Sequence, residues 1–87
     1  MNIGEAVVAL KRGEKVARTG SNGKNMFLFL VPGREYEVYK PPLLGLYPPG
    51  TVVDYRSHVD MRAADGEIVP WTCSQSDLLA DDWTVVD

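Results

Sequence analysis

The longest apolar run of the chain covers residues 26–31 and reads MFLFLV. It ends at Pro32 after six residues, far short of the roughly 20 residues that a membrane-spanning helix needs. A short apolar run that stops at a proline is typical of a strand buried on both faces. We therefore expect one face of this strand to pack against a helix and the other against a second copy of the chain.

A short amphipathic helix is predicted upstream, because apolar side chains recur at positions 3, 6, 7 and 10. Asn2 is placed to cap its start and Gly13 to end it. Residues 15–18 (KVAR) predict a strand between this helix and the apolar run. Asn22-Gly23 then predicts a tight hairpin turn that joins the two strands.

The middle of the chain reads as a long proline-rich connection. Residues 35–39 predict a weak strand, and prolines and glycines interrupt the segment from Pro41 to Gly50. The loop nevertheless carries large apolar side chains, at Leu43, Leu44, Leu46 and Tyr47. We expect it to pack on another surface, such as a neighbouring subunit.

The last third of the chain predicts a hairpin, a short helix and a closing strand. Residues 58–63 and 67–69 flank an Asp-Gly turn and form the hairpin. Ser74 followed by Asp77 matches a capping box and should start a helix of one to two turns. Residues 83–86 then supply the strand.

These elements predict an α+β fold in which a small antiparallel sheet carries an N-terminal helix and a short C-terminal helix. The 87 residues are expected to form a single domain, residues 1–87. A domain of this size buries only about 60% of its extended surface, which favours self-association. The one cysteine, Cys73, has no partner for an internal disulfide, and the first residues lack the pattern of a secretory signal, so we expect a cytosolic protein.

The charge pattern argues against some partners. The formal charge of −3 disfavours unspecific binding to a DNA or RNA polymer, which depends on neutralising many phosphates. Residues 1–40 hold seven Lys or Arg and four Glu, whereas residues 41–87 hold two Arg and eight Asp or Glu. This asymmetry fits a small anionic ligand held between the halves, but it is also compatible with an ordinary solvated surface.

Common catalytic and metal-binding patterns are missing. A metal site needs several converging ligands, and the sequence has one histidine, His58, and one cysteine. A catalytic pair of these two residues is less plausible than a buried cysteine and a surface histidine. Residues 20–25 (GSNGKN) lack the spacing and the Ser or Thr of a phosphate loop. We expect no cofactor, no metal and no membrane span.

Two stretches remain as candidate ligand-binding segments. In residues 18–24, a glycine-bearing turn around Asn22 lies between Arg18 and Lys24, and its backbone N–H groups could hold a phosphate. The alternative is a plain hairpin turn with surface salt bridges at the two cations.

The second stretch covers residues 70–83 and brings Trp71 to the start of the predicted helix. An indole face can stack on a purine, and a helix start attracts anions. The alternative is a capped helix between two core tryptophans, and the position of Trp83 at the start of an apolar strand favours the core for that residue.

The whole chain resembles a small family of phage proteins that counter Thoeris immunity, the second type of Thoeris anti-defence protein. The resemblance rests on the opening helix, the KVAR strand, Asn22-Gly23-Lys24, the 61–68 hairpin and above all residues 69–83. The chain departs from the family pattern at Ser21, where an aromatic is common, and at Cys73, where proline or another small residue is common.

The resemblance implies a sponge: a homotetramer in the cytoplasm of the infected bacterium that binds a cyclic ADP-ribose-type signal, glycocyclic ADP-ribose, without cleaving it. Cyclic dinucleotides or trinucleotides would be a second ligand class. Arg18 and Lys24 are then expected at the pyrophosphate and Trp71 and Tyr39 on adenine. Polar side chains near the helix start are expected at ribose hydroxyls or the base edge: Ser74, Gln75 and Asp77, the last of which has capping as a competing role.

Two other function classes stay open from the sequence. One is a protein-binding inhibitor module that docks on a host factor through residues 43–47. The other is a nucleotide-cleaving enzyme, for which the chain offers few candidate bases or metal ligands.

Overall fold

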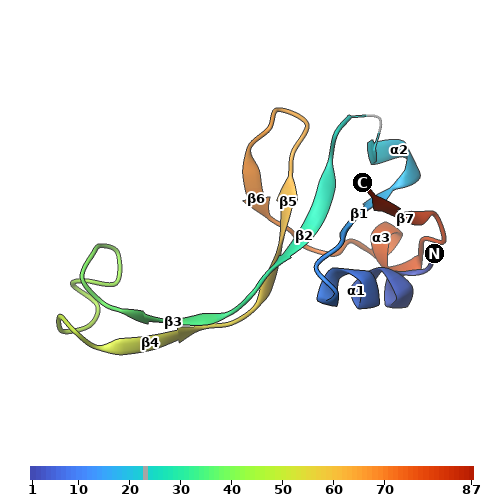
Figure 1. Ribbon diagram of the computed structural model, residues 1–87. Helices are drawn as coiled ribbons and strands as arrows, with labels where there is room; N and C mark the ends of the chain where they lie inside the picture. The colour runs from blue at the N-terminus through green and yellow to red at the C-terminus, as the bar shows by residue number, and fades with distance from the viewer. Residues whose placement is uncertain (23) are drawn as a thin grey trace.

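A five-stranded antiparallel sheet forms the body of the molecule in the computed structural model (Figure 1). The structure describes residues 1–22 and 24–87, apart from the side chains of Ser21 and Asn22. The strands follow the order β6-β5-β2-β1-β7. Their bounds are β1 (Lys15–Arg18), β2 (Phe27–Val31), β5 (His58–Arg62), β6 (Ile68–Pro70) and β7 (Trp83–Val86).

Helix α1 (Ile3–Lys11) covers one face of this sheet and closes the core. Its buried side chains Ala6, Ala9 and Leu10 pack with Val16, Leu28 and Trp83 of the sheet. The helix starts with a complete capping box between Asn2 and Glu5. It ends before Gly13, whose φ of 86° lies in the region that favours glycine. The predicted helix and both of its end signals are confirmed.

The short helix α3 (Gln75–Leu79) lies beside the N-terminal part of the fold and is also held by a capping box. The Ser74 hydroxyl accepts from the Asp77 N–H at 3.0 Å, and the Ser74 N–H donates to the Asp77 carboxylate at 3.4 Å. This box was predicted from the spacing of the two residues. The remaining short helix, α2 (Thr19–Asn22), follows β1.

The prediction of a tight turn between the first two strands is wrong. β1 and β2 do pair, with Val16 opposite Leu28, but the helical turn α2 and the residues after it separate them. The turn signal Asn22-Gly23 falls in this connection, and Gly23 lies outside the described residues.

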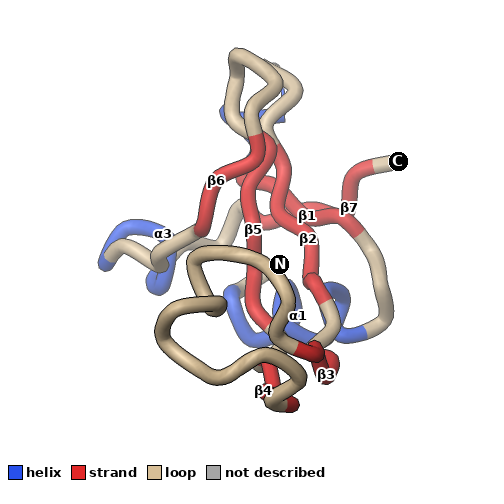
Figure 2. Tube along the Cα trace, turned by 90° about the vertical axis from the view of Figure 1, so that its left-hand side faces the viewer, coloured by secondary structure: helices blue, strands red, loops and turns tan. Residues whose placement is uncertain are grey.

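A second, two-stranded sheet projects from the body as a curved arm (Figures 1 and 2). It consists of β3 (Arg34–Glu37) and β4 (Val52–Tyr55), which continue β2 and lead into β5. The molecule is therefore elongated, with extents of 46 × 26 × 25 Å. The weak strand predicted at residues 35–39 overlaps β3, whereas no element was predicted for the residues of β4.

The arm leaves the body at a close crossing of two chain segments. A Cβ added at Gly33 would lie 2.4 Å from the Tyr55 carbonyl oxygen and 2.7 Å from the Ser57 backbone nitrogen. The Gly33 N–H donates to the Ser57 hydroxyl at 3.0 Å. Only glycine fits between these segments without a shift of the backbone.

Overall, the structure confirms the predicted α+β class, a small antiparallel sheet with an N-terminal helix and a short C-terminal helix. Within the described part of the chain, none of the helices has the length and apolar character that a membrane crossing requires.

Candidate functional site

A small pocket of about 150 Å³ opens beside the core, where β1 and β2 separate beyond the Val16–Leu28 pair. Its walls come from β1, β2 and the residue before it, β5, the segment before α3, α3 itself and β7. The side chains that matter for its chemistry are Arg18, Met26, Met61, Trp71, Asp77 and Trp83.

The two tryptophans form the aromatic wall. Their rings meet edge to face, with centroids 6.0 Å apart and an interplanar angle of 89°. Trp83 is 4% exposed and belongs to the core, as its position in the sequence favoured. Trp71 is half-buried and packs against that core, so the fixed Trp83 ring orients it.

The polar part of the site is built around Arg18. Its Nε donates to Asp82 Oδ1 at 2.8 Å, and its Nη1 donates to Asp77 Oδ1 at 3.3 Å. The hydrogen bond to Asp82 is the main cause that raises the pKa of Arg18, followed by the bond to Asp77. In return, the bond from Arg18 lowers the pKa of Asp82 below its ordinary value. Both partners are therefore charged at neutral pH.

Asp77 links three elements through three different atoms. One carboxylate oxygen accepts from Arg18, the other accepts from the Ser74 N–H, and the backbone oxygen accepts from Trp83 Nε1 at 3.0 Å. The sequence left capping and ligand contact as competing roles for this residue. The capping role is present in the structure, and it fixes the carboxylate at the edge of the pocket.

The fold brings some of the predicted ligand residues together and separates others. Arg18, Trp71 and Asp77 line the pocket, and Ser74 and Gln75 form the start of the helix that carries Asp77.

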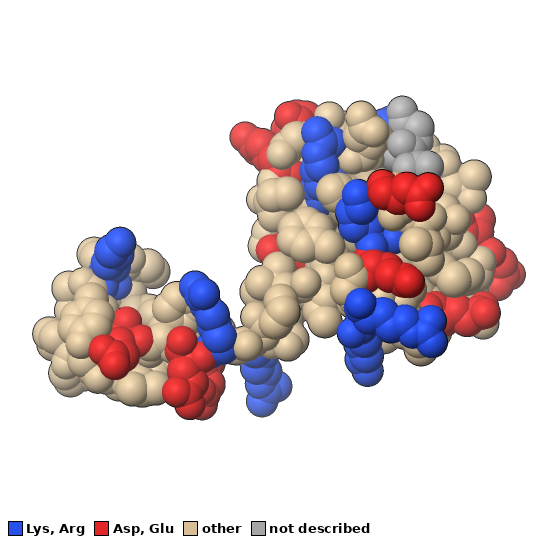
Figure 3. Space-filling model, in the orientation of Figure 1, with Lys and Arg blue, Asp and Glu red and all other residues tan. Residues whose placement is uncertain are grey.

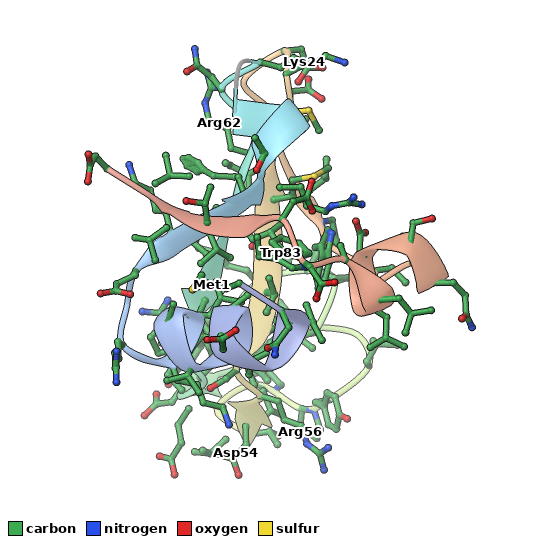
Figure 4. All side chains as sticks on the ribbon, turned by 90° about the vertical axis from the view of Figure 1, so that its right-hand side faces the viewer. Met1, Lys24, Asp54, Arg56, Arg62 and Trp83 are labelled. Atoms are coloured by element: carbon green, nitrogen blue, oxygen red, sulfur yellow. The ribbon has the colours of Figure 1, made fainter. Side chains whose placement is uncertain are left out.

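Two predicted residues, Lys24 and Tyr39, do not join this group, and the side chain of a third, Asn22, is not described. Lys24 lies with Arg62 at the upper end of the molecule, away from Trp83 (Figure 4). Tyr39 is on the arm, 61% exposed, and donates to Glu37 Oε2 at 2.7 Å, which raises the pKa of its phenol.

Sequence reasoning missed two kinds of site residue. Asp82 is not among the predicted ligand residues, because nothing in the local sequence shows that it meets Arg18 across 64 positions. Met26 and Met61 read as ordinary strand residues, yet both line the pocket beside the indole of Trp71. Flexible thioethers next to an aromatic wall adapt well to a flat ligand.

The site can hold a planar group against Trp71, accept hydrogen bonds from hydroxyls at its carboxylates, and donate to an anion from Arg18. In residues 1–22 and 24–87, no three His, Cys, Asp or Glu side chains come together as a set of metal ligands.

Comparison with known proteins matches the chain along nearly its whole length. A family model described as the Thoeris anti-defense 2-like domain matches residues 1–86. The protein Thoeris anti-defense 2 of Bacillus phage SP01 is 40% identical over 95 residues, which cover 99% of this chain and 94% of the phage protein. This chain belongs to the Thoeris anti-defense 2-like family.

Proposed function

We propose that this chain counters Thoeris defence as a sponge: it binds a cyclic ADP-ribose-type signal, glycocyclic ADP-ribose, and keeps it from its effector without cleaving it. The observation that carries the proposal is the meeting of Trp71, Arg18 and Asp77 in one pocket of a chain that belongs to this family. The place of action in this proposal is the cytoplasm of the infected bacterium.

The three side chains suit different parts of such a ligand. The Trp71 face would stack on adenine. The carboxylate of Asp77 would accept hydrogen bonds from ribose hydroxyls, and Ser74 and Gln75 beside it could also donate to them. Arg18 has five N–H donors, of which the structure uses two, so three remain for a pyrophosphate oxygen. Asp82 and Asp77 occupy Nε and one donor of Nη1, so a phosphate oxygen would use the donors that remain free on Nη1 and Nη2.

The size of the pocket supports an assembly of several copies. Its volume of about 150 Å³ is smaller than the roughly 300–1,000 Å³ of sites that enclose a drug-sized ligand. A cyclic dinucleotide-sized signal therefore needs walls from a second copy. We propose a homotetramer in which Lys24, Asn22 and Tyr39 reach ligand bound to a neighbouring copy. Cyclic dinucleotides or trinucleotides form a second class of ligand in this proposal.

A sponge needs slow release and no chemistry. Nanomolar retention corresponds to about −12 kcal/mol, which a stacked base, several charge-assisted hydrogen bonds and exclusion of water can supply. The proposal therefore assigns no nucleophile and no general base to any residue, and the protein is not an enzyme in it.

One experiment separates a sponge from an enzyme. The protein is incubated with glycocyclic ADP-ribose, freed of excess ligand by rapid desalting and heated until it unfolds, and the released nucleotide is separated by chromatography. Recovery of the intact cyclic compound in stoichiometric amount supports the proposal. A linear product would assign the protein to the nucleotide-cleaving enzymes, and an empty supernatant would reject binding. The same procedure with a panel of cyclic oligonucleotides, read by native mass spectrometry, reports ligand class and subunit number together.

A second candidate function is a protein-binding inhibitor, and the tip of the arm favours it. Leu46 is 73% exposed there, and Tyr47 beside it is also exposed. A tip that docks on a host factor would capture that factor in the absence of any nucleotide, and Leu46→Ser would abolish the capture. If wild type and variant capture the same proteins, the tip is not such a docking site.

A further inference from the structure

The ribbon of the arm has two chemically different faces. Arg34 pairs with Tyr55, so these side chains share one face with Tyr36, two residues along. Glu35 pairs with Asp54 on the opposite face. An apolar, aromatic face thus lies behind an acidic one, the pattern of a ribbon that buries one side.

The aromatic face forms the floor of a hollow of about 910 Å³, which we name the saddle. Tyr36 and Tyr55 meet edge to face with centroids 5.1 Å apart, and the Arg34 guanidinium lies 4.2 Å from the centre of the Tyr36 ring. Residues 41–43 of the tip close one end, and residues 31–32 with His58 close the other. The arm curves so that tip and body rise on the same side, and a narrow waist separates them (Figures 1 and 3).

The floor of the saddle lacks a packing partner in the single chain. A two-stranded ribbon alone is marginally stable in water, and three or more strands or a packed partner are normally required. Yet both tyrosines of the floor are more than a third exposed, at 39% for Tyr36 and 45% for Tyr55.

Helix α3 also exposes apolar side chains that lack a packing partner. It has five residues and buries none of them, although isolated helices shorter than about 12 residues are marginal in water. Leu78 is 48% exposed and Leu79 is 75% exposed, so the helix presents two large apolar side chains to solvent. The helix is acidic at its end, where Asp81 and Asp82 follow it, and only Asp82 has an ion-pair partner among the described residues.

The charges of the two surfaces are complementary. Arg34 and Lys40 lie at the saddle, and in the described part of the chain neither pairs with a carboxylate. One carboxylate, Glu37, also lines the saddle, and the Tyr39 hydroxyl donates to it. The saddle is thus apolar with excess positive charge, whereas α3 is apolar with unpaired negative charge at Asp81.

We propose that the saddle of one copy binds helix α3 of a second copy. Leu78 and Leu79 pack on the floor formed by Tyr36 and Tyr55, and Asp81 faces Lys40. Each copy carries both surfaces, and in the proposed arrangement two copies exchange them reciprocally about a two-fold axis.

This contact would also complete the ligand pocket of the proposed sponge, and that consequence rests on the proposed function. Helix α3 carries Asp77 at the small pocket, so docking brings the arm of the second copy, with Tyr39 next to Lys40, to the edge of that pocket. The second copy then adds an aromatic side chain, Tyr39, to a pocket whose own aromatic wall is Trp71 and Trp83.

A charge-swap experiment tests the contact. Lys40→Glu and Asp81→Lys each place like charges across it, so each variant alone should lose subunits relative to the wild-type assembly in size-exclusion chromatography with light scattering. We expect the dissociation constant to rise at least about tenfold, because like charges brought together at an interface are strongly disfavoured. An equimolar mixture of the two variants should restore the assembly, because the new glutamate then faces the new lysine and the native pair forms on the other side.

Two further variants serve as a control for the charge change and as a test of the apolar contact. Arg56→Glu makes the same charge change on the arm but outside the lining of the saddle, near Asp54 (Figure 4), and should leave the assembly unchanged. Leu79→Ser alters a side chain that is mostly exposed in the single chain and should dissociate the copies without unfolding them. A monomeric wild type at micromolar concentration, single variants that assemble like the wild type, or a mixture without rescue would each overturn the contact.

Calorimetry with glycocyclic ADP-ribose separates this proposal from the proposed function. An assembly that responds to the charge swap but does not bind the nucleotide rejects the sponge and leaves the contact in place. If the nucleotide binds tightly but the charge-swap variants assemble like the wild type, the contact is rejected and the sponge is not.

Discussion

Arg18 Nε lies 2.8 Å from Asp82 Oδ1, and this ion pair joins the end of β1 to the residue that precedes β7. The next residue strengthens the link, because the backbone N–H and the hydroxyl of Thr19 both donate to the Asp82 carbonyl oxygen, at 3.1 and 2.9 Å. The guanidinium that the proposed ligand needs is therefore held in place before any ligand binds.

Asp82→Asn should lower stability in a pH-dependent way. The bond from Arg18 lowers the pKa of Asp82 in the folded state, so the carboxylate stabilises the fold above its unfolded pKa of about 3.9. That contribution is lost as the pH falls through the lower, folded-state pKa. Urea unfolding should show a less stable variant at pH 7 and a difference that shrinks below about pH 4. Asp54→Asn on the arm is the control. At pH 2, about two units below the unfolded pKa of an aspartate, the difference between Asp82→Asn and wild type should be largely lost. A difference that stays constant down to about pH 2 would contradict the argument.

Trp71→Ala should weaken binding of glycocyclic ADP-ribose while leaving the protein folded. Stacking on an aromatic side chain is worth about 1–3 kcal/mol per base, so the dissociation constant should rise by about 5-fold to 150-fold in calorimetry. Trp71→Phe keeps an aromatic face and should recover most of the affinity. Equal affinity of all three proteins would show that Trp71 does not stack on the ligand.

Ser74→Ala should cost about 1 kcal/mol of stability, because the Asp77 N–H loses its acceptor at the start of α3. Ser74→Asn offers a carbonyl oxygen in the same place and should restore the loss. Denaturant unfolding of the three proteins at neutral pH measures both effects. If Ser74→Ala has the same free energy of unfolding as the wild type, the cap contributes nothing to the stability of the fold.

Gly33→Ala should destabilise the base of the arm. The new methyl group would lie 2.4 Å from the Tyr55 carbonyl oxygen, and a backbone shift at such a crossing costs about 1–3 kcal/mol. Gly20→Ala is the matched control, because a Cβ there meets no atom within 4 Å. Thermal unfolding should separate the two variants, and equal melting temperatures would contradict the close crossing.

The starts of α1 and α3 could be predicted because their signals are local. Asn2 bonds Glu5 and Ser74 bonds Asp77, each over three residues, so the spacing in the sequence already contains the interaction. Strand β4 could not be predicted in the same way. Its four residues follow a proline and glycine tract, and they become a strand only by pairing with β3, which lies 15 or more positions away.

The candidate site was predictable only in part, for a related reason. Arg18, Trp71 and Asp77 stood out as residue types, and the fold brings them together. The expected partnership of Arg18 with Lys24 assumed a tight turn, but the helix α2 follows Arg18 instead, and Lys24 lies away from Trp83 in Figure 4. Asp82 takes the place next to Arg18 instead, through a contact that no short sequence window contains.

The narrow crossing at Gly33 has a consequence for how changes in the arm affect the rest of the chain. Everything from β3 to β4 is attached to the body through one pair of adjacent segments, and the core of α1, β1, β2 and β7 makes no use of it. Residues 34–56 thus lie outside this core, so a change confined to them leaves the scaffold that carries Trp71 and Arg18 intact.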